Sequence, residues 1–264
     1  MDNLLGRKIR DLINKEGKIT FARFMDMALY EEGLGYYQKQ NPFGMQGSFY
    51  TSVNSSSAFG FCVAEGIKSL IEDFGFKENI CEMGAGNGLL ANDILDYYQR
   101  HYPEVYEKIN YFIIEKSSYL VGIQKGTLNP HKGKVNWLSF EELNGFEGVF
   151  FSNELVDAFP VHRVIRINGE LKELYVIEHE GKLTFYPDSF STKELENYIN
   201  FINVPILDNQ IVDINLDSVR WIKALGRKIS KGVVITIDYG FMAEQLYAPF
   251  RMDGTVTCYF RHTQ

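Results

Sequence analysis

The chain has 264 residues, of which 45% are hydrophobic and 23% are charged, with 34 acidic against 27 basic side chains and a net charge of −7. This composition is ordinary for a folded globular protein and excludes collagen-like, low-complexity and disordered classes. The mildly acidic chain carries no basic stripe, so it lacks the electrostatic footprint of a protein that binds nucleic acid.

Cysteine and histidine usage gives no sign of a metal centre. Cys62, Cys81 and Cys258 are widely separated, and the five histidines form no H-E-x-x-H pattern. Such a set fits a reducing compartment and predicts neither a disulfide framework nor a zinc site. Residues 1–18 are patterned as a helix rather than as a signal or transit peptide, and no apolar run could span a bilayer. We therefore expect a cytoplasmic protein without a metal or a membrane span.

Apolar side chains at helical spacing predict three amphipathic helices in the first 75 residues. Thr20, which precedes the second helix, is of a residue type that caps helix N-termini. A loop rich in Gly, Asn and Ser separates the second helix from the third. The predicted helices cover 5–13, 21–29 and 59–71, and the loop covers 38–57.

Short apolar strands then alternate with helices, a pattern typical of a parallel sheet covered by helices. The four strands are predicted at Asn79–Met83, Tyr111–Glu115, Gly148–Asn153 and Gly232–Asp238.

The segment between the third and fourth strands has a different sequence pattern. Asn168-Gly169 favours a tight hairpin turn, so we predict an inserted β-meander there. Its strands are expected at His162–Ile167, Leu171–Ile177 and Lys182–Tyr186, with helices following at 192–202 and 217–230.

The chain is accordingly predicted to have an α/β fold divided into four ranges along the sequence. The ranges are an N-terminal helical region at 1–75, a cofactor-binding core at 76–160, an inserted meander and helical subdomain at 161–212, and the remainder of the core at 213–264.

The strongest local motif is a glycine-rich turn between the first strand and the helix that follows it. Glu82 precedes Gly84-Ala85-Gly86-Asn87-Gly88, and glycines there let the backbone turn sharply against a ligand. A dinucleotide fingerprint needs the spacing G-x-G-x-x-G to hold a pyrophosphate. The G-x-G-x-G spacing instead points to S-adenosylmethionine (SAM), which has no phosphate, and makes a nicotinamide-dependent oxidoreductase a distant alternative.

Further candidate cofactor residues lie at the ends of neighbouring strands. Glu115 ends the second strand, where a carboxylate can accept hydrogen bonds from both ribose hydroxyls. Trp137 and Leu138 could flank an adenine ring, although Trp137 is equally interpretable as a core residue. Asn153, at the end of the third strand, is a further candidate for cofactor binding.

Acidic residues cluster where the methyl acceptor should bind. Ligands of open α/β sheets bind beyond the carboxyl ends of the strands, where strand order reverses. Glu154 and Asp157 follow the third strand, and Asp238 ends the fourth. We predict that Glu154 is the main catalytic carboxylate, with Asp157 or Asp238 as the second acid. The alternative roles are an exposed or helix-capping acid for Glu154 and a helix-capping or turn residue for Asp238.

The motifs occur in an order that resembles the MidA-like family of class I SAM-dependent methyltransferases, which includes a mitochondrial assembly factor for respiratory complex I. The matching segments are Gly33–Tyr37, Gly47–Ser52, Glu82–Gly88, Asn153–Val161, Ile237–Gly240 and Gly254–Tyr259. The resemblance implies a Rossmann-like methyltransferase with N-terminal helices and an inserted subdomain. It also implies S-adenosylhomocysteine as product and an arginine of a protein substrate as acceptor.

By motif position, the resemblance implies that Glu82 to Gly88 hold SAM, that Thr51 and Ser52 approach it, and that Glu154 faces the acceptor. Two departures stand out. The family's T-S-P-E reads Thr51-Ser52-Val53-Asn54 here, and family members usually run on past the segment that begins at Gly254. We therefore expect a C-terminally truncated sheet in which the strand at 232–238 is an edge.

Two alternatives to an arginine methyltransferase stay open at this point. One is a non-catalytic assembly protein that keeps the SAM-binding fold without turnover, which the altered loop after Thr51 and the early end favour. The other is a methyltransferase that acts on a small molecule. An open acidic groove favours a protein substrate, and a closed aromatic pocket favours a small one.

Overall fold

The structure is a computed structural model in which residues 4–39 and 56–258 are described. Contacts within the chain divide it into two discontinuous units. Within the described residues, unit one comprises 4–36, 158–222 and 239–258, and unit two comprises 37–39, 56–157 and 223–238. The predicted N-terminal helical region thus contributes its first two helices to unit one and its third to unit two.

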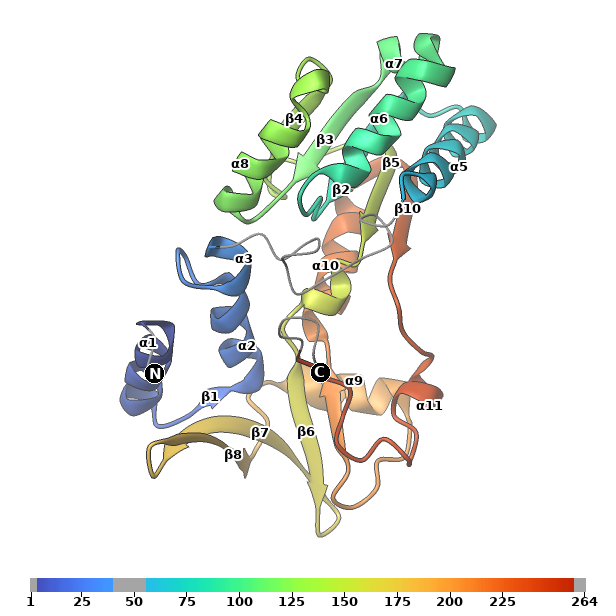
Figure 1. Cartoon of the computed structure of the whole chain (residues 1–264). Helices are drawn as coiled ribbons and strands as arrows, with labels where there is room; N and C mark the ends of the chain where they lie inside the picture. Colours follow the sequence, from blue (N-terminus) through green and yellow to red (C-terminus); the bar gives the residue numbers. More distant parts are fainter. Residues whose placement is uncertain (1–3, 40–55, 259–264) are drawn as a thin grey trace. The chain divides into compact units, whose positions relative to one another are not determined.

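Unit two is built on a parallel sheet with the strand order β10-β5-β2-β3-β4 (Figure 1). The chain starts in the middle at β2, adds β3 and β4 on one side, and then adds β5 and β10 on the other. Strand order therefore reverses between β2 and β5, which is where open α/β sheets bind ligands. The strands are β2 (Asn79–Met83), β3 (Asn110–Ile114), β4 (Val135–Leu138), β5 (Phe146–Asn153) and β10 (Ile229–Ile237).

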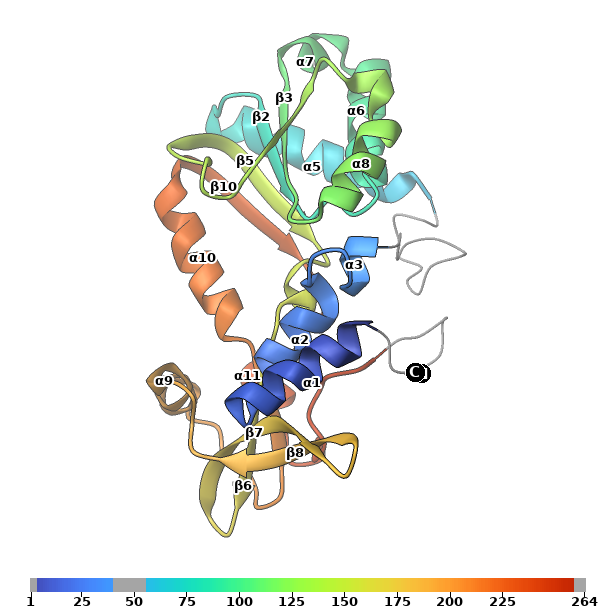
Figure 2. The same ribbon diagram turned by 90° about the vertical axis from the view of Figure 1, so that its left-hand side faces the viewer.

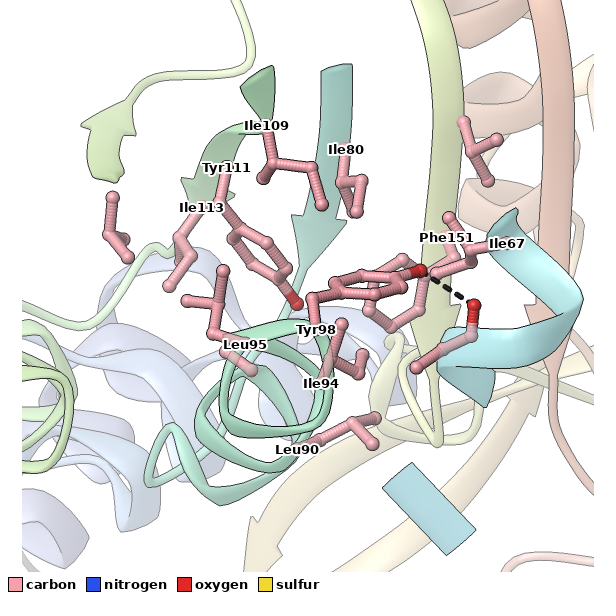
Figure 3. Close-up of a cluster of buried hydrophobic side chains, with 14 of the residues drawn as sticks. Ile67, Ile80, Leu90, Ile94, Leu95, Tyr98, Ile109, Tyr111, Ile113 and Phe151 are labelled. Atoms are coloured by element: carbon pink, nitrogen blue, oxygen red, sulfur yellow. Dashed lines mark hydrogen bonds between the residues drawn. The ribbon is translucent and has the colours of Figure 1, made fainter. Parts of the chain in front are cut away.

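Helices cover this sheet and form its main hydrophobic core, drawn in Figure 3. Tyr98 of α6 is fully buried in the core, and its hydroxyl donates to the backbone oxygen of Ala64 in α5 at 2.6 Å. Gly75, with a left-handed φ of 59°, caps the C-terminus of α5, which runs three residues beyond the predicted bound at 71. The helical segments are α3 (Tyr36–Lys39), α5 (Ala58–Phe74), α6 (Leu89–His101), α7 (Pro103–Lys108), α8 (Ser118–Thr127), η1 (Asn129–His131) and η2 (Val156–Ala158).

Unit one contains an antiparallel sheet in the order β1-β7-β6-β9, with β8 also paired to β7. Its strands β6, β7 and β8 are labelled in Figure 2. Asn168 and Gly169 both have positive φ, as the predicted hairpin turn requires. The predicted meander is therefore confirmed. The strands are β1 (Ile19–Thr20), β6 (His162–Ile167), β7 (Glu170–His179), β8 (Lys182–Asp188) and β9 (Ile211–Ile214).

Two hydrophobic clusters hold helices against the strands of unit one. In the first, Ile9 and Ile13 of α1 pack with Val176 of β7, and in the second Leu195 of α9 packs with Val164 of β6. Thr20 caps α2 as predicted, because its hydroxyl accepts the N–H of Arg23 at 3.1 Å. The helices are α1 (Leu4–Glu16), α2 (Phe21–Tyr30), α9 (Lys193–Ile202), α10 (Leu216–Lys228), which continues into unit two, and α11 (Ala243–Leu246).

The predicted α/β fold with a parallel sheet is confirmed, with local corrections. β1 and β9 were not predicted, because each is very short and is formed by pairing with a distant strand. The helix predicted to run to Ser230 ends at Lys228, because Ile229 pairs with Phe146 and begins β10. β10 pairs only with β5 among the described residues, so the predicted edge strand is confirmed.

Candidate functional site

The glycine turn connects β2 to α6 with a backbone that favours glycine. Gly84, Gly86 and Gly88 have φ of 76°, 56° and 82°. An L-residue pays about 1–2 kcal/mol in this left-handed region, so the local conformation explains all three glycines. The N–H of Gly84 donates to the oxygen of Ile114 at 2.9 Å, which ties the turn to the end of β3.

The space around Gly84 and Gly88 matters less than their backbone conformation, because the nearest atoms are the end of a flexible side chain and a backbone carbon at ordinary contact distance. A Cβ atom on Gly84 would lie 2.8 Å from Cδ1 of Leu155, and one on Gly88 would lie 3.4 Å from Cα of Gln124. Within the turn, Ala85 is buried, and Oδ1 of Asn87 accepts the N–H at the start of α6. The structure thus places the five predicted turn residues together at the carboxyl end of β2.

Glu82 is almost completely buried in β2, with 2% of its surface exposed. The pKa of Glu82 is raised to about 7, chiefly by burial; a hydrogen bond from Tyr111 opposes the increase, and the nearby carboxylate of Glu115 adds to it. The Tyr111 hydroxyl donates to Oε2 of Glu82 at 2.7 Å. A direct contact between Glu82 and a cofactor stays a prediction.

Glu115 lies just beyond β3 and is held by hydrogen bonds to both of its oxygens. Oε1 accepts the N–H of Ser117 at 2.9 Å, and Oε2 accepts Nε2 of Gln124 at 3.0 Å. The same Nε2 donates to the oxygen of Gly86 at 2.9 Å. Burial raises the pKa of Glu115, while these hydrogen bonds oppose the increase. The carboxylate is therefore fixed beside the glycine turn, as a ribose-binding acid should be.

Trp137 and Leu138 lie within β4, one strand beyond Glu115. Trp137 packs against the hydrophobic core, in line with its alternative interpretation, and its Nε1 donates to Oε1 of Gln124 at 2.9 Å. An adenine contact by either residue stays a prediction.

The segment after β5 is held by the end of β10. Glu154 has a left-handed φ of 48°, and its N–H donates to the oxygen of Ile237 at 2.8 Å. Oδ2 of Asp238 accepts the N–H groups of Val156 and Asp157 at 3.0 and 3.2 Å. Asp238 therefore orders the start of η2, which was the alternative role considered for it. Asn153 is the last residue of β5 and lies directly before this segment.

The three predicted catalytic carboxylates, those of Glu154, Asp157 and Asp238, lie together at the carboxyl ends of β5 and β10. Partial desolvation raises the pKa of Glu154, and the carboxylates of Asp157 and Asp238 raise it further. The side chains of Glu154 and Asp157 are exposed. An exposed acidic cluster at the ends of β5 and β10 is able to attract a cation and to accept a proton.

Some predicted site residues cannot be placed, and one important residue was missed. Thr51 and Ser52 lie outside the described residues. The sequence analysis did not identify Gln124 as a site residue. Gln124 lies on α8, four residues after Leu120 and four before Leu128, on the face where an apolar residue is expected. A polar side chain on the apolar face of a helix is a usable signal, because buried polar groups need partners.

Neither a metal site nor a membrane span emerges from the residues that the structure describes. Within 4–39 and 56–258, no three His, Cys, Asp or Glu side chains are grouped so that they could hold a metal ion. In the same ranges, every helix is too short or too polar to cross a bilayer.

Comparisons with known proteins agree with this geometry. A family model described as "Putative S-adenosyl-L-methionine-dependent methyltransferase" matches residues 62–264. A crystal structure from Burkholderia thailandensis with bound S-adenosyl-homocysteine has a TM-score of 0.88 and 27% identity, covering 98% of this chain and 68% of that one. A native crystal structure from the same organism has a TM-score of 0.84 and 27% identity, covering 98% and 67%.

Curated relatives are more distant in sequence. The zebrafish (Danio rerio) protein arginine methyltransferase NDUFAF7, mitochondrial, is 25% identical over 93% of this chain and 61% of its own length. The Caenorhabditis elegans homologue is 25% identical over 69% of this chain and 48% of its own length. The chain thus spans about half to three fifths of the curated relatives that it matches.

Proposed function

Because this chain belongs to the S-adenosyl-L-methionine-dependent methyltransferase family whose model it matches, we propose that it binds SAM through unit two and methylates an arginine of a protein. The observation that carries the proposal is the glycine turn at the point of strand reversal, with a fixed carboxylate beside it. Names of relatives support the arginine acceptor, and the exposed acidic cluster after β5 is consistent with it.

The residues at the ends of β2 and β3 fit a nucleoside cofactor. The turn from Gly84 to Gly88 presents backbone without side chains at its three glycines, which allows close approach of a ligand. A carboxylate offers about four acceptor positions, so Glu115 can accept ribose hydroxyls in addition to its N–H donors. When bound, SAM would supply an activated methyl group on a sulfonium. Thr51, Ser52 and Asn153 are proposed as further cofactor residues.

The proposed methyl acceptor is an arginine guanidinium, which stays protonated at neutral pH. A free guanidinium has a pKa above about 12, so a nucleophilic nitrogen must lose a proton during the reaction. Glu154, whose pKa is raised, is a stronger base than an ordinary glutamate and would accept that proton. Asp157 would hold the guanidinium by a charge-assisted hydrogen bond, and Asp238, which accepts the N–H of Asp157, would keep that residue in place.

Cofactor binding is tested by calorimetric titration of the full chain with SAM and with S-adenosylhomocysteine. We expect saturable binding of both. Saturable binding without methyl transfer to any acceptor would instead support a non-catalytic assembly protein. Absence of binding would refute the proposal at its first step.

Catalysis is tested by incubating the chain with methyl-labelled SAM and a dialysed protein extract, followed by mass spectrometry of the hydrolysed protein. We expect label in dimethylarginine. The Glu154→Gln variant should keep its SAM affinity and lose methyl transfer by about 10²–10⁴-fold, because the proton acceptor is removed. Label in another side chain would replace the arginine assignment, and an active Glu154→Gln variant would remove Glu154 from the mechanism.

The pH dependence of the wild-type rate is a second readout for Glu154. An acid with a raised pKa becomes protonated, and inactive as a base, at a higher pH than an ordinary glutamate. The rate should therefore fall on acidification before the usual titration range of glutamate is reached.

A cytoplasmic location stays a separate prediction, which fractionation of cells that express the tagged chain would test.

A further inference from the structure

We infer that Gln124 is a positioning residue that holds the Glu115 carboxylate and the glycine turn in the arrangement required to grip a ribose. Gln124 is completely buried on α8 and hydrogen-bonds three separate segments of unit two. This inference rests on the proposed binding of SAM, and it goes further by assigning a role to a residue outside the recognised motifs.

The orientation of the Gln124 amide follows from its neighbours. The indole N–H of Trp137 can only donate, so the group that faces it at 2.9 Å must be the amide oxygen. Nε2 then points at two acceptors, the oxygen of Gly86 at 2.9 Å and Oε2 of Glu115 at 3.0 Å. All three contacts agree with a single orientation of the amide.

No other common side chain would satisfy this set of partners. A glutamate at position 124 could accept from Trp137 but would bring a second negative charge to Glu115 and a repulsive oxygen to Gly86. A methionine would fill similar volume without donating to either. A buried site with one donor and two acceptors therefore specifies glutamine, which explains a polar residue on the apolar face of α8.

The network also determines how Glu115 is presented. Oε1 is fixed by Ser117 and Oε2 by Gln124, so the plane of the carboxylate cannot rotate freely. Three other charged residues lie near this network. The carboxylate of Glu82 interacts with that of Glu115, the backbone N–H of Lys116 donates to the Glu115 carboxylate, and Nζ of Lys125 lies 5.5 Å from the centre of the Trp137 ring. The neutral amide thus holds an acid for which no ion pair is recorded among the described residues.

The test compares S-adenosylhomocysteine with its 2′-deoxyadenosyl counterpart by calorimetry. In the wild type, a hydroxyl bound to a carboxylate should make the deoxy ligand bind about ten- to a hundredfold more weakly. In Gln124→Met we expect the complete ligand to bind at least tenfold more weakly and the deoxy penalty to shrink to about threefold or less. Gln124→Glu should weaken binding further near neutral pH, because it adds the like charge.

A pH titration of affinity separates positioning from general loss of structure. The Gln124 hydrogen bond lowers the pKa of Glu115, so its removal should shift the acid-side loss of affinity to higher pH. The matched control is Tyr98→Phe, which removes a buried hydrogen bond of the same unit, to the backbone oxygen of Ala64, that involves none of the residues bound to Gln124. We expect the control to lose stability while its deoxy penalty and pH midpoint stay at wild-type values.

The outcomes distinguish this inference from the proposed function. If the wild type binds no S-adenosylhomocysteine, the proposed function itself fails. If the wild type binds but Gln124→Met keeps the full deoxy penalty and the wild-type pH midpoint, then Gln124 does not position Glu115 and the inference is overturned. A Gln124→Met variant that also unfolds at the assay temperature would be replaced by Trp137→Phe, which removes only the donor that orients the amide and should reduce the deoxy penalty in the same direction.

Discussion

Both units bury acidic side chains, but they stabilise them in different ways. In unit one, Asp213 is 6% exposed and pairs with Nε of Arg163 at 2.9 Å, and its other oxygen accepts the N–H groups of Thr255 and Val256. In unit two, Glu82 is 2% exposed, and no ion pair to it is recorded in 4–39 or 56–258. A hydroxyl is its hydrogen-bond partner instead.

Glu173 completes the contrast. It is fully buried in β7, receives a hydrogen bond from the backbone of Ser191 and lies 2.7 Å from Nδ1 of His162. Unit one thus pairs its buried acids with basic groups of its own, which is what a structural role requires. Unit two keeps acids of raised pKa at the carboxyl ends of its strands, which is typical of a functional site. The two units therefore use the same residue types for different purposes.

The largest loss of stability is expected when the ion pair of unit one is broken. Asp213→Ala leaves the mostly buried Arg163 guanidinium and two backbone N–H groups without their acceptor. Loss of one partner of a buried pair costs about 3–5 kcal/mol of unfolding free energy. Urea denaturation measures this loss. The matched control is Glu170→Ala, which removes an exposed pair with Lys172 and should change stability far less. Equal effects of the two substitutions would contradict a structural role for Asp213.

A somewhat smaller effect is expected from the buried acid of unit two, and it depends on pH. Glu82 has a pKa of about 7 in the folded chain and about 4.5 when exposed, so the folded state binds the additional proton between these values. Stability should therefore fall as pH rises from about 4.5 to 7, by about 3 kcal/mol from this group alone. Glu82→Gln should abolish this contribution, which the difference between wild-type and variant unfolding free energies across that range would measure. A difference that does not vary with pH would show that Glu82 titrates normally.

The smallest effects are expected when either of two helix-capping residues is replaced. Thr20 caps α2 in unit one, and Ser117 caps α8 in unit two, where its Oγ also donates to the oxygen of Tyr37 at 2.6 Å. Replacement of either by alanine should cost about 1 kcal/mol of stability. Only Ser117→Ala should also weaken SAM binding, by a few-fold in calorimetry, because α8 carries Gln124. The comparison fails if Thr20→Ala weakens SAM binding to the same extent.

Much of the parallel sheet could be predicted from the sequence because its strands are continuous apolar runs bounded by glycine and polar residues. β2 was predicted with its exact bounds, and the glycine turn after it was identified by spacing alone. Glu115 was predicted by the same logic as the acid that ends the next strand, and the structure places it one residue beyond β3. These features are local, so nearby residues determine them.

Features that depend on distant partners were not predicted. β9 is four residues long and exists as a strand through its pairing with β6 about 50 residues earlier. The role of Asp238 was left open in the sequence because capping and catalysis use the same carboxylate, and its bonds to Val156 and Asp157 span more than 80 residues. Gln124 has no motif, and its importance follows only from the three segments that meet at its amide.

The sequence by itself determined the class of sheet, the glycine turn after β2 and the acids at the ends of the strands, because periodicity and glycine conformation act within a few residues along the chain. The tertiary structure decided which of those acids are paired with basic groups, which keep a raised pKa, and which polar side chain joins them. The pairing and the pKa of each acid depend on its burial and on partners that are far away in the sequence. Burial and these partners set the free energy of a buried charge.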